Sequence, residues 1–162
     1  MRFAPAAAAL SLVLAMTASV GHAGAGDPDP RAAQLIVEGR AALNAGDAQG
    51  AIDAFEAAFA VDPAYTPVLN DLAAAARAEG LQGKAIRFYR EVLERDPGNL
   101  AAISGEGAAM VEKGALEKAR RNLAQLESLC GAKCPETLAL QASIARGPAT
   151  RMAAGESDVT QN

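Results

Sequence analysis

The only two cysteines of this 162-residue chain, Cys130 and Cys134, stand four positions apart in the stretch LCGAKCPE. Two thiols at this spacing could hold a metal ion, exchange disulfides or form a structural bridge. A tetrahedral zinc site needs four ligands, or three and a water, and the only histidine, His22, lies in an N-terminal segment that we expect to be removed. Redox pairs of the C-x-x-C type have two intervening residues beside a βαβ pattern, whereas three intervene here without any strand pattern. We therefore favour a structural disulfide, with thiol–disulfide exchange as the alternative.

Other arrangements that could support catalysis are missing from the sequence. Without a histidine after His22, a serine–histidine pair cannot form and the usual proton carrier near neutral pH is absent. Carboxylates at helical spacing, such as Glu91 with Glu94, are typical of a solvated helix face. Gly105 and Gly107 fall inside an expected helix, so they do not form a phosphate-binding loop after a strand. We predict no enzymatic activity, no catalytic residue, no cofactor and no metal.

The first residues have the layout of a secretory signal peptide. Arg2 is followed by an apolar run over 6–18, and small residues around Ala23 and Ala25 form a cleavage site. The apolar run is shorter than the roughly 20 residues of a spanning helix, so we expect no stable membrane insertion after cleavage; an uncleaved N-terminal anchor is the alternative. We predict a signal peptide over 1–23, with cleavage after Ala23 or Ala25.

Composition adds to the expected location. The Ala- and Gly-rich chain indicates a bacterial protein, and export then predicts the periplasm or secretion, where paired cysteines are joined. A formal net charge of −4, with no basic run, argues against nucleic acid as a partner.

The strongest internal signal is a period of 34 residues that four kinds of position share. The positions are Gly46, Gly80 and Gly114; Ala51, Ala85 and Ala119; Phe55, Tyr89 and Leu123; and Pro63 with Pro97. In this pattern the glycines can take a positive φ at a turn between paired helices. The small residues let two helices approach closely, and the larger side chains fill the space beside them.

This period resembles that of the tetratricopeptide repeat, a helix–turn–helix unit. The motif positions carrying the resemblance are Leu35-x2-Glu38-Gly39-x2-Ala42 and its counterparts Leu69-x2-Leu72-Ala73-x2-Ala76 and Ile103-x2-Glu106-Gly107-x2-Met110, followed by Ala51-x3-Phe55, Ala85-x3-Tyr89 and Ala119-x3-Leu123. The resemblance covers about residues 30–131. The chain departs from the family pattern where Trp and Tyr are replaced by smaller side chains in the first helices, which implies a modest stability.

The resemblance implies an all-α fold, a right-handed α-solenoid of three helix–turn–helix units with a C-terminal capping helix. We expect helices at about 30–44, 48–61, 66–79, 82–95, 99–113, 116–129 and 135–146, with Asp29 and Thr66 as N-caps. The repeats occupy about 32–65, 66–99 and 100–131. A short linker covers 24–29, and 147–162 is expected to be disordered. In the capping helix, 135–146, we expect Leu138, Ala142 and Ala145 to share the apolar face that covers the stack.

In this family the first helix of each repeat lines a concave groove that binds peptides or partner proteins. The corresponding positions here are Ile36, Arg40, Leu43, Asn44, Asn70, Arg77, Ser104, Val111 and Glu112. Our hypothesis is that Arg40 and Arg77 receive an acidic or polar peptide, with Ile36, Leu43 and Val111 giving apolar contact. The alternative is that both arginines only solvate the surface.

Some family members grip a free C-terminal carboxylate with lysine, asparagine and arginine at five groove positions. The matching positions here are Ile36, Arg40, Asp71, Ala101 and Gly105, so this clamp is not expected. The sequence therefore predicts an exported adaptor for a protein or peptide partner. Its architecture is similar to that of small exported repeat proteins of pilus assembly, secretion and cytochrome maturation.

Processing gives a first prediction. The exported protein should begin at Gly24 or Gly26, because small residues at Ala23 and Ala25 follow the apolar run. N-terminal sequencing of the exported protein measures this start directly. Recovery of intact Met1 in the membrane fraction would contradict the expectation of a processed chain.

Overall fold

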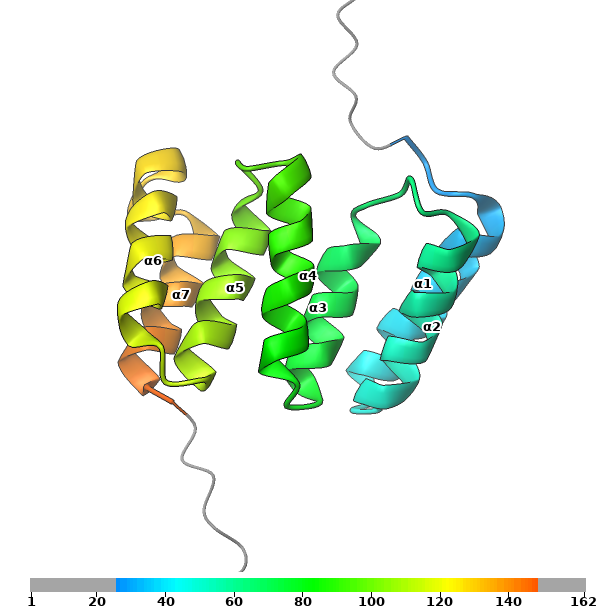
Figure 1. The fold of residues 1–162 in the computed structure, drawn as a ribbon, viewed down its shortest axis with the longest axis horizontal. Helices are drawn as coiled ribbons and strands as arrows, with labels where there is room; N and C mark the ends of the chain where they lie inside the picture. The colour runs from blue at the N-terminus through cyan, green and yellow to red at the C-terminus, as the bar shows by residue number, and fades with distance from the viewer. Residues whose placement is uncertain (1–25, 149–162) are drawn as a thin grey trace, which may run out of the picture.

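The computed structural model describes residues 26–148, which form seven α-helices stacked in a row, with α7 between α5 and α6 in this view (Figure 1). The helices are α1 (Pro30–Asn44), α2 (Ala48–Val61), α3 (Val68–Ala78), α4 (Gln82–Arg95), α5 (Leu100–Glu112), α6 (Leu116–Cys130) and α7 (Pro135–Arg146). The predicted signal peptide over 1–23, its cleavage sites and most of the predicted tail lie outside the described residues. No helix within 26–148 is both long and apolar enough to cross a bilayer.

The helices pair as the 34-residue period predicts. The most extensive contacts join α1 to α2, α3 to α4, and α5 to α6, and each pair packs on the next. A two-helix unit cannot bury its apolar face alone, so stacking extends one core along the chain. The predicted solenoid of three helix–turn–helix units with a capping helix is thus confirmed.

The turns within the pairs depend on glycine at the predicted positions. Gly46, Gly80 and Gly114 have φ angles of 84°, 79° and 81°, values that side chains with a Cβ rarely adopt. The C-caps of the second helices α2 and α4 are Asp62 and Asp96, each directly before a proline, as expected.

One expected helix start is wrong. Asp29 caps α1 by accepting a hydrogen bond from the Arg31 N–H at 2.8 Å, but Thr66 does not cap α3. Pro67 is the N-cap, no side chain accepts a capping hydrogen bond there, and the helix begins at Val68. The chain first passes through a tight turn in which the Leu69 N–H donates to the Thr66 carbonyl at 3.0 Å. Pro67 has helical φ and ψ, but α-helical hydrogen bonding starts after it.

Large side chains packed against glycines hold the helices close together. A Cβ added to Gly39 of α1 would lie 2.6 Å from the Phe55 ring of α2, and one added to Gly107 of α5 would lie 2.6 Å from Leu140 of α7. A Cβ on Gly105 would overlap the ring of Tyr89 from α4. The helix α5 therefore receives a large side chain from each neighbouring unit, and it is the most buried helix of the stack.

The capping helix α7 packs on α5 and α6, but with a different face from the one expected. Thr137 and Leu140 are fully buried and Ile144 is half-buried. Leu138 is 51 % exposed, and Ala142 and Ala145 are also exposed. The prediction of the Leu138 face was wrong because the space left by Gly107 accepts Leu140, which turns Leu138 outward.

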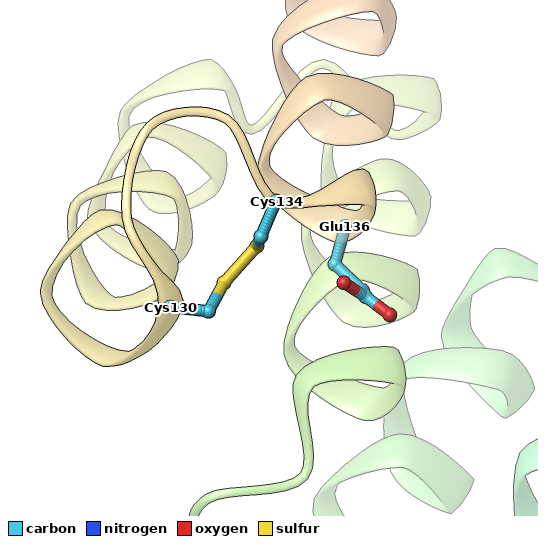
Figure 2. Close-up of side chains that lie close together, drawn as sticks. All are labelled: Cys130, Cys134 and Glu136. Carbon is cyan, nitrogen blue, oxygen red and sulfur yellow. A yellow bond between two sulfur atoms is a disulfide. The ribbon is translucent and has the colours of Figure 1, made fainter.

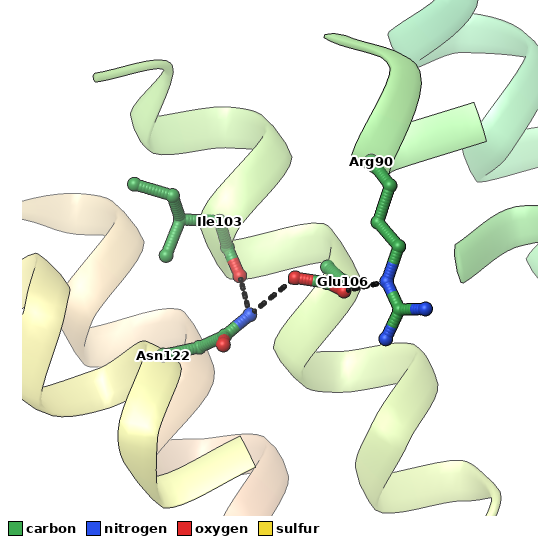
Figure 3. Close-up of polar contacts among 4 residues, drawn as sticks. All are labelled: Arg90, Ile103, Glu106 and Asn122. Atoms are coloured by element: carbon green, nitrogen blue, oxygen red, sulfur yellow. Dashed lines mark hydrogen bonds and ion pairs between the residues drawn. The ribbon is translucent and has the colours of Figure 1, made fainter. Parts of the chain in front are cut away.

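A buried carboxylate ties three helices together (Figure 3). Glu106 of α5 is 6 % exposed. Its Oε1 accepts a hydrogen bond from Arg90 Nε of α4 at 2.8 Å, and its Oε2 accepts one from Asn122 Nδ2 of α6 at 2.9 Å. The same amide group donates to the Ile103 carbonyl at 3.1 Å. Because both carboxylate oxygens are hydrogen-bonded, the charge is tolerated at this depth, and it fixes how α4, α5 and α6 meet.

The glycine contacts predict that adding a methyl group at two different glycines changes stability in opposite directions. Gly39→Ala should lower the free energy of unfolding by about 1–3 kcal/mol, because the new methyl group collides with Phe55. Gly83→Ala in α4 is the matched control: nothing lies within 4 Å of its added Cβ, so it should raise stability by up to about 1 kcal/mol. Urea unfolding of both variants measures the difference. Equal effects would show that the Gly39 contact does not set the helix spacing.

Candidate functional site

The predicted groove residues do line up on the first helices, but two of them are in the core. Ile36 of α1 is 4 % exposed and belongs to the cluster that includes Phe55. Val111 of α5 is 2 % exposed and packs with Met110 and Ala119. Only a small part of its surface lines a hollow of the groove. The expectation that these two side chains grip a ligand is therefore wrong, because each is covered by the neighbouring helices. Leu43 is half-buried against the core.

Both arginines of the hypothesis are held by carboxylates from the next first helix. Arg40 Nη2 of α1 donates to Asp71 Oδ2 of α3 at 2.7 Å, and the hydrogen bond to Asp71 raises the pKa of Arg40. Arg77 Nε of α3 donates to Glu112 Oε1 of α5 at 2.8 Å. These pairs link consecutive first helices along the groove. The carboxylates offset the positive charge of the two arginines, which we had expected to bind an acidic or polar peptide.

The remaining predicted groove residues are polar and at least partly accessible. Asn44 is exposed at the end of α1. Asn70 Nδ2 of α3 donates to Asn99 Oδ1 at 3.4 Å. Ser104 Oγ of α5 donates to the backbone carbonyl of Glu136 at 3.1 Å, and so connects the first turn of α7 to the groove. These side chains could offer hydrogen bonds to a ligand.

Part of the groove runs between α5 and α7. Three open hollows adjoin there, with volumes of about 360, 330 and 340 Å³. We call them the first, middle and last hollows, in order from Pro135 to Pro148. The first and middle hollows share Arg77, Ser104, Gly105 and Ala139, so they form one continuous depression.

Sequence reasoning missed the contribution of α7 to this surface. Ala139, Ala142, Ser143 and Arg146 line the middle hollow. The 34-residue period carries a usable signal, because Ala142 and Arg146 lie one period after Ala108 and Glu112. The capping helix α7 therefore also lines the groove, after the first helices α1, α3 and α5.

Tyr89 is a second groove residue that the sequence did not identify. It comes from α4, a second helix, and reaches the first hollow beneath Gly105. Burial raises the pKa of Tyr89, and the nearby Arg77 guanidinium opposes that rise. Its hydroxyl is therefore protonated near neutral pH and is positioned beside Arg77 at the floor of the groove.

The two cysteines are joined as a disulfide in the corner between α6 and α7 (Figure 2). Cys130 ends α6, Gly131 turns the chain with a φ of 89°, and Cys134 is the N-cap of α7. The buried Thr137 hydroxyl donates to the Gly131 carbonyl at 3.0 Å and lies 3.0 Å from Cys134 Sγ. The bridge thus closes a corner that hydrogen bonds already shape.

Glu136 lies beside the bridge, and its carboxylate is within 4.8 Å of both sulfur atoms (Figure 2). Three such groups could in principle bind a metal ion. The thiolate is the form of cysteine that ligates metals. The two sulfur atoms are joined in a disulfide, so neither is a thiolate. In its oxidised form, this corner therefore offers no thiolate to a metal ion.

Comparisons with known proteins identify the fold. No family model and no curated protein matches the chain. Among solved structures, the chain is similar to the tetratricopeptide-repeat (TPR) domain of Sgt2 from Aspergillus fumigatus, with a TM-score of 0.65 and 24 % identity over 83 % of this chain and 93 % of that one. It is also similar to the first TPR of Spaghetti (RPAP3) bound to the HSP90 peptide SRMEEVD, with a TM-score of 0.63 and 20 % identity over 72 % and 91 %.

A further similar structure is the second TPR domain of human RPAP3 in complex with the HSP70 peptide SGPTIEEVD. The TM-score is 0.60 at 16 % identity, over 70 % of this chain and 98 % of that chain. Identities at this level establish a shared fold, and each match spans nearly the whole of the other domain.

The disulfide yields a stability prediction. Replacing both cysteines, Cys130→Ser with Cys134→Ser, should lower the free energy of unfolding by about 1–3 kcal/mol, because the closed ring restricts the unfolded chain. Circular dichroism should show nearly native helix content, since the caps and the Thr137 hydrogen bond remain. If oxidised and reduced protein melt at the same temperature, the bridge does not stabilise the corner.

The reduction potential separates this role from the alternative of thiol–disulfide exchange. A structural bridge is expected below about −300 mV, whereas exchange proteins lie near −120 to −200 mV. A value in the higher range, with a depressed thiolate pKa for either cysteine, would favour exchange.

Proposed function

From the TPR fold of this chain, we propose that the protein is a non-catalytic adaptor that binds a segment of a partner protein in its concave groove. Three hollows adjoin along the groove, and side chains that line them can donate hydrogen bonds to a bound segment. The partner is a protein or peptide rather than nucleic acid, consistent with the formal net charge of −4.

The continuous depression between α5 and α7 is the observation that carries this proposal. Its floor is made of small residues, among them Gly105, Ala108 and Ala139, so that no side chain fills it. Polar groups of Arg77, Ser104 and the Tyr89 hydroxyl stand at its walls and floor. A concave site with a few convergent polar groups is typical of ligand recognition.

The similar structures support a peptide-sized occupant, because two of them hold bound peptides. The groove chemistry of this chain nevertheless differs at the five positions of the family's C-terminal carboxylate clamp. Ile36 is buried, Asp71 pairs with Arg40, and Gly105 covers the Tyr89 ring. We therefore propose that this groove takes a partner segment other than one anchored by such a clamp.

Export forms the second part of the proposal. The signal-peptide pattern of the first residues and the bridge between Cys130 and Cys134 both support an oxidising compartment, the periplasm or the cell exterior. An exported adaptor of this size suits the assembly of envelope complexes such as pili or secretion machinery.

Blocking the groove tests this function. The partner is first captured from periplasmic extract and purified, and its affinity is measured by calorimetry. Ala74→Trp should weaken binding at least tenfold, about 1.4 kcal/mol. Ala74 occupies the same place in the period as Ala108, which lines the middle hollow. The fold should tolerate the larger side chain, because Arg40 occupies the equivalent position of the first repeat and is exposed.

The matched control is Ala60→Trp, which adds the same side chain at an exposed position of the second helix α2. It should leave both affinity and melting temperature unchanged. Recognition through the second helices would be indicated if Ala60→Trp weakened binding while Ala74→Trp did not.

A further inference from the structure

The middle hollow is the part of the groove with the clearest chemical character. Three first-helix-type elements enclose it: α3 contributes Arg77, α5 contributes Ser104, and α7 contributes Ser143 and Arg146. All of the polar side chains that line it carry hydrogen-bond donors, and none of its lining residues is a carboxylate. The hollow thus gathers two guanidinium groups and two hydroxyl groups around about 330 Å³ of open space. The charge of Arg77 is offset by Glu112, which lines the adjoining last hollow, so Arg146 supplies the positive charge without an ion-pair partner.

The two guanidinium groups retain donors for a ligand. The hydrogen bond from Arg77 to Glu112 uses Nε, and the Tyr89 hydroxyl also interacts with this guanidinium, so that the other N–H groups of its two terminal nitrogens are left for a second partner. Arg146 donates from Nη2 to Ser143 Oγ at 3.1 Å and forms no ion pair with any residue in the range 26–148. An anion in the hollow would be attracted by Arg146, and the remaining N–H groups of Arg77 could donate hydrogen bonds to it.

The floor of the hollow leaves room for such a group. Gly105, Ala108, Ala139 and Ala142 extend no further than Cβ. Arg40 and Arg77 are paired with Asp71 and Glu112, so Arg146 is the one cation at the groove that lacks an ion-pair partner among the described residues. Charge complementarity therefore points to an acidic group from outside the chain.

We propose that the middle hollow receives the carboxylate side chain of an aspartate or glutamate in the bound partner segment. The carboxylate would accept hydrogen bonds from Arg77 and Arg146, with Ser143 as an additional donor. Arginine suits this task because its planar group binds carboxylates with two parallel hydrogen bonds. This inference deepens the proposed function and rests on it, since it names the chemistry of the same groove.

The shape of the depression favours a side chain over a chain terminus. The first and last hollows continue it on both sides, toward Pro135 and Pro148, so a bound segment can pass through the middle hollow in both directions. The 12 residues of α7 span about 18 Å, which corresponds to about five residues of extended chain. We therefore expect an acidic residue near the centre of a segment of about this length.

A peptide library tests the inference without knowledge of the natural partner. The exported chain is immobilised and exposed to randomised peptides of about seven residues, acetylated and amidated at their ends so that only side chains carry carboxylates. Retained peptides should be enriched in aspartate or glutamate at one position. A parallel library with free C-termini shows whether a terminal carboxylate serves instead.

The pairing is then assigned with a double-mutant cycle on the best retained peptide. Arg146→Gln in the protein and Glu→Gln (or Asp→Asn) in the peptide should each weaken binding at least about fivefold, about 1 kcal/mol, and together no more than either change alone. Arg121→Gln is the matched control, because Arg121 is exposed on α6 and lies outside the hollows. It should leave binding unchanged.

The outcomes separate this inference from the function on which it rests. Retained peptides without acidic enrichment, additive effects in the cycle, or retention only of peptides with a free C-terminus would overturn the side-chain site while leaving groove binding intact. If the chain retains no peptide from either library, the proposed groove function fails and the acidic site fails with it.

Discussion

The stack depends on one kind of contact, in which a large side chain from one helix packs against a glycine of another. Phe55 on Gly39 sets the spacing within the first pair, and Tyr89 on Gly105 joins the second unit to the third. Leu140 on Gly107 seats the capping helix on α5. Because a single methyl group cannot be added at these points without displacing a ring or a leucine, the small residues are requirements of the packing.

The same contact builds the groove. Gly105 is both the point where Tyr89 enters from α4 and part of the floor of the first and middle hollows. A larger residue there would push the tyrosine away and fill the depression.

The charged groups are arranged around these glycine contacts. The pairs Arg40–Asp71 and Arg77–Glu112 join consecutive first helices, and Glu106 joins α4, α5 and α6 on the other side of α5. Such partly buried pairs define how neighbouring helices fit rather than supplying large stability.

Much of the fold could be predicted from the sequence because its determinants are local or periodic. The turn glycines, the prolines that end the second helices and the spacing of small and large residues all recur every 34 residues, and the cysteines lie close enough to bridge one corner. The bounds of α1, α2, α4 and α7 match those expected. What failed depends on contacts between units. The positions equivalent to Ile36 in the later repeats hold the polar or small residues Asn70 and Ser104. The adjacent helices nevertheless bury Ile36.

The candidate site shows the same limit. The period identified Arg77 and Ser104 as groove residues, and both line the hollows. It could not reveal that Asp71 and Glu112 hold the two arginines, because those pairs join residues 31 and 35 positions apart rather than one period. Nor could spacing within a helix show that Tyr89 passes between units, or that Leu140 rather than Leu138 faces the core.

We propose that this chain recognises a protein segment with its concave face. Amide chemical shifts of the ¹⁵N-labelled protein, recorded with and without a bound peptide or partner, test it residue by residue. The largest changes are expected at α3, α5 and α7, around Arg77, Ser104, Ala108 and Ala139, with the exposed faces of α2, α4 and α6 little affected. Changes confined to those second helices, with the groove residues unaffected, would contradict recognition through the concave face.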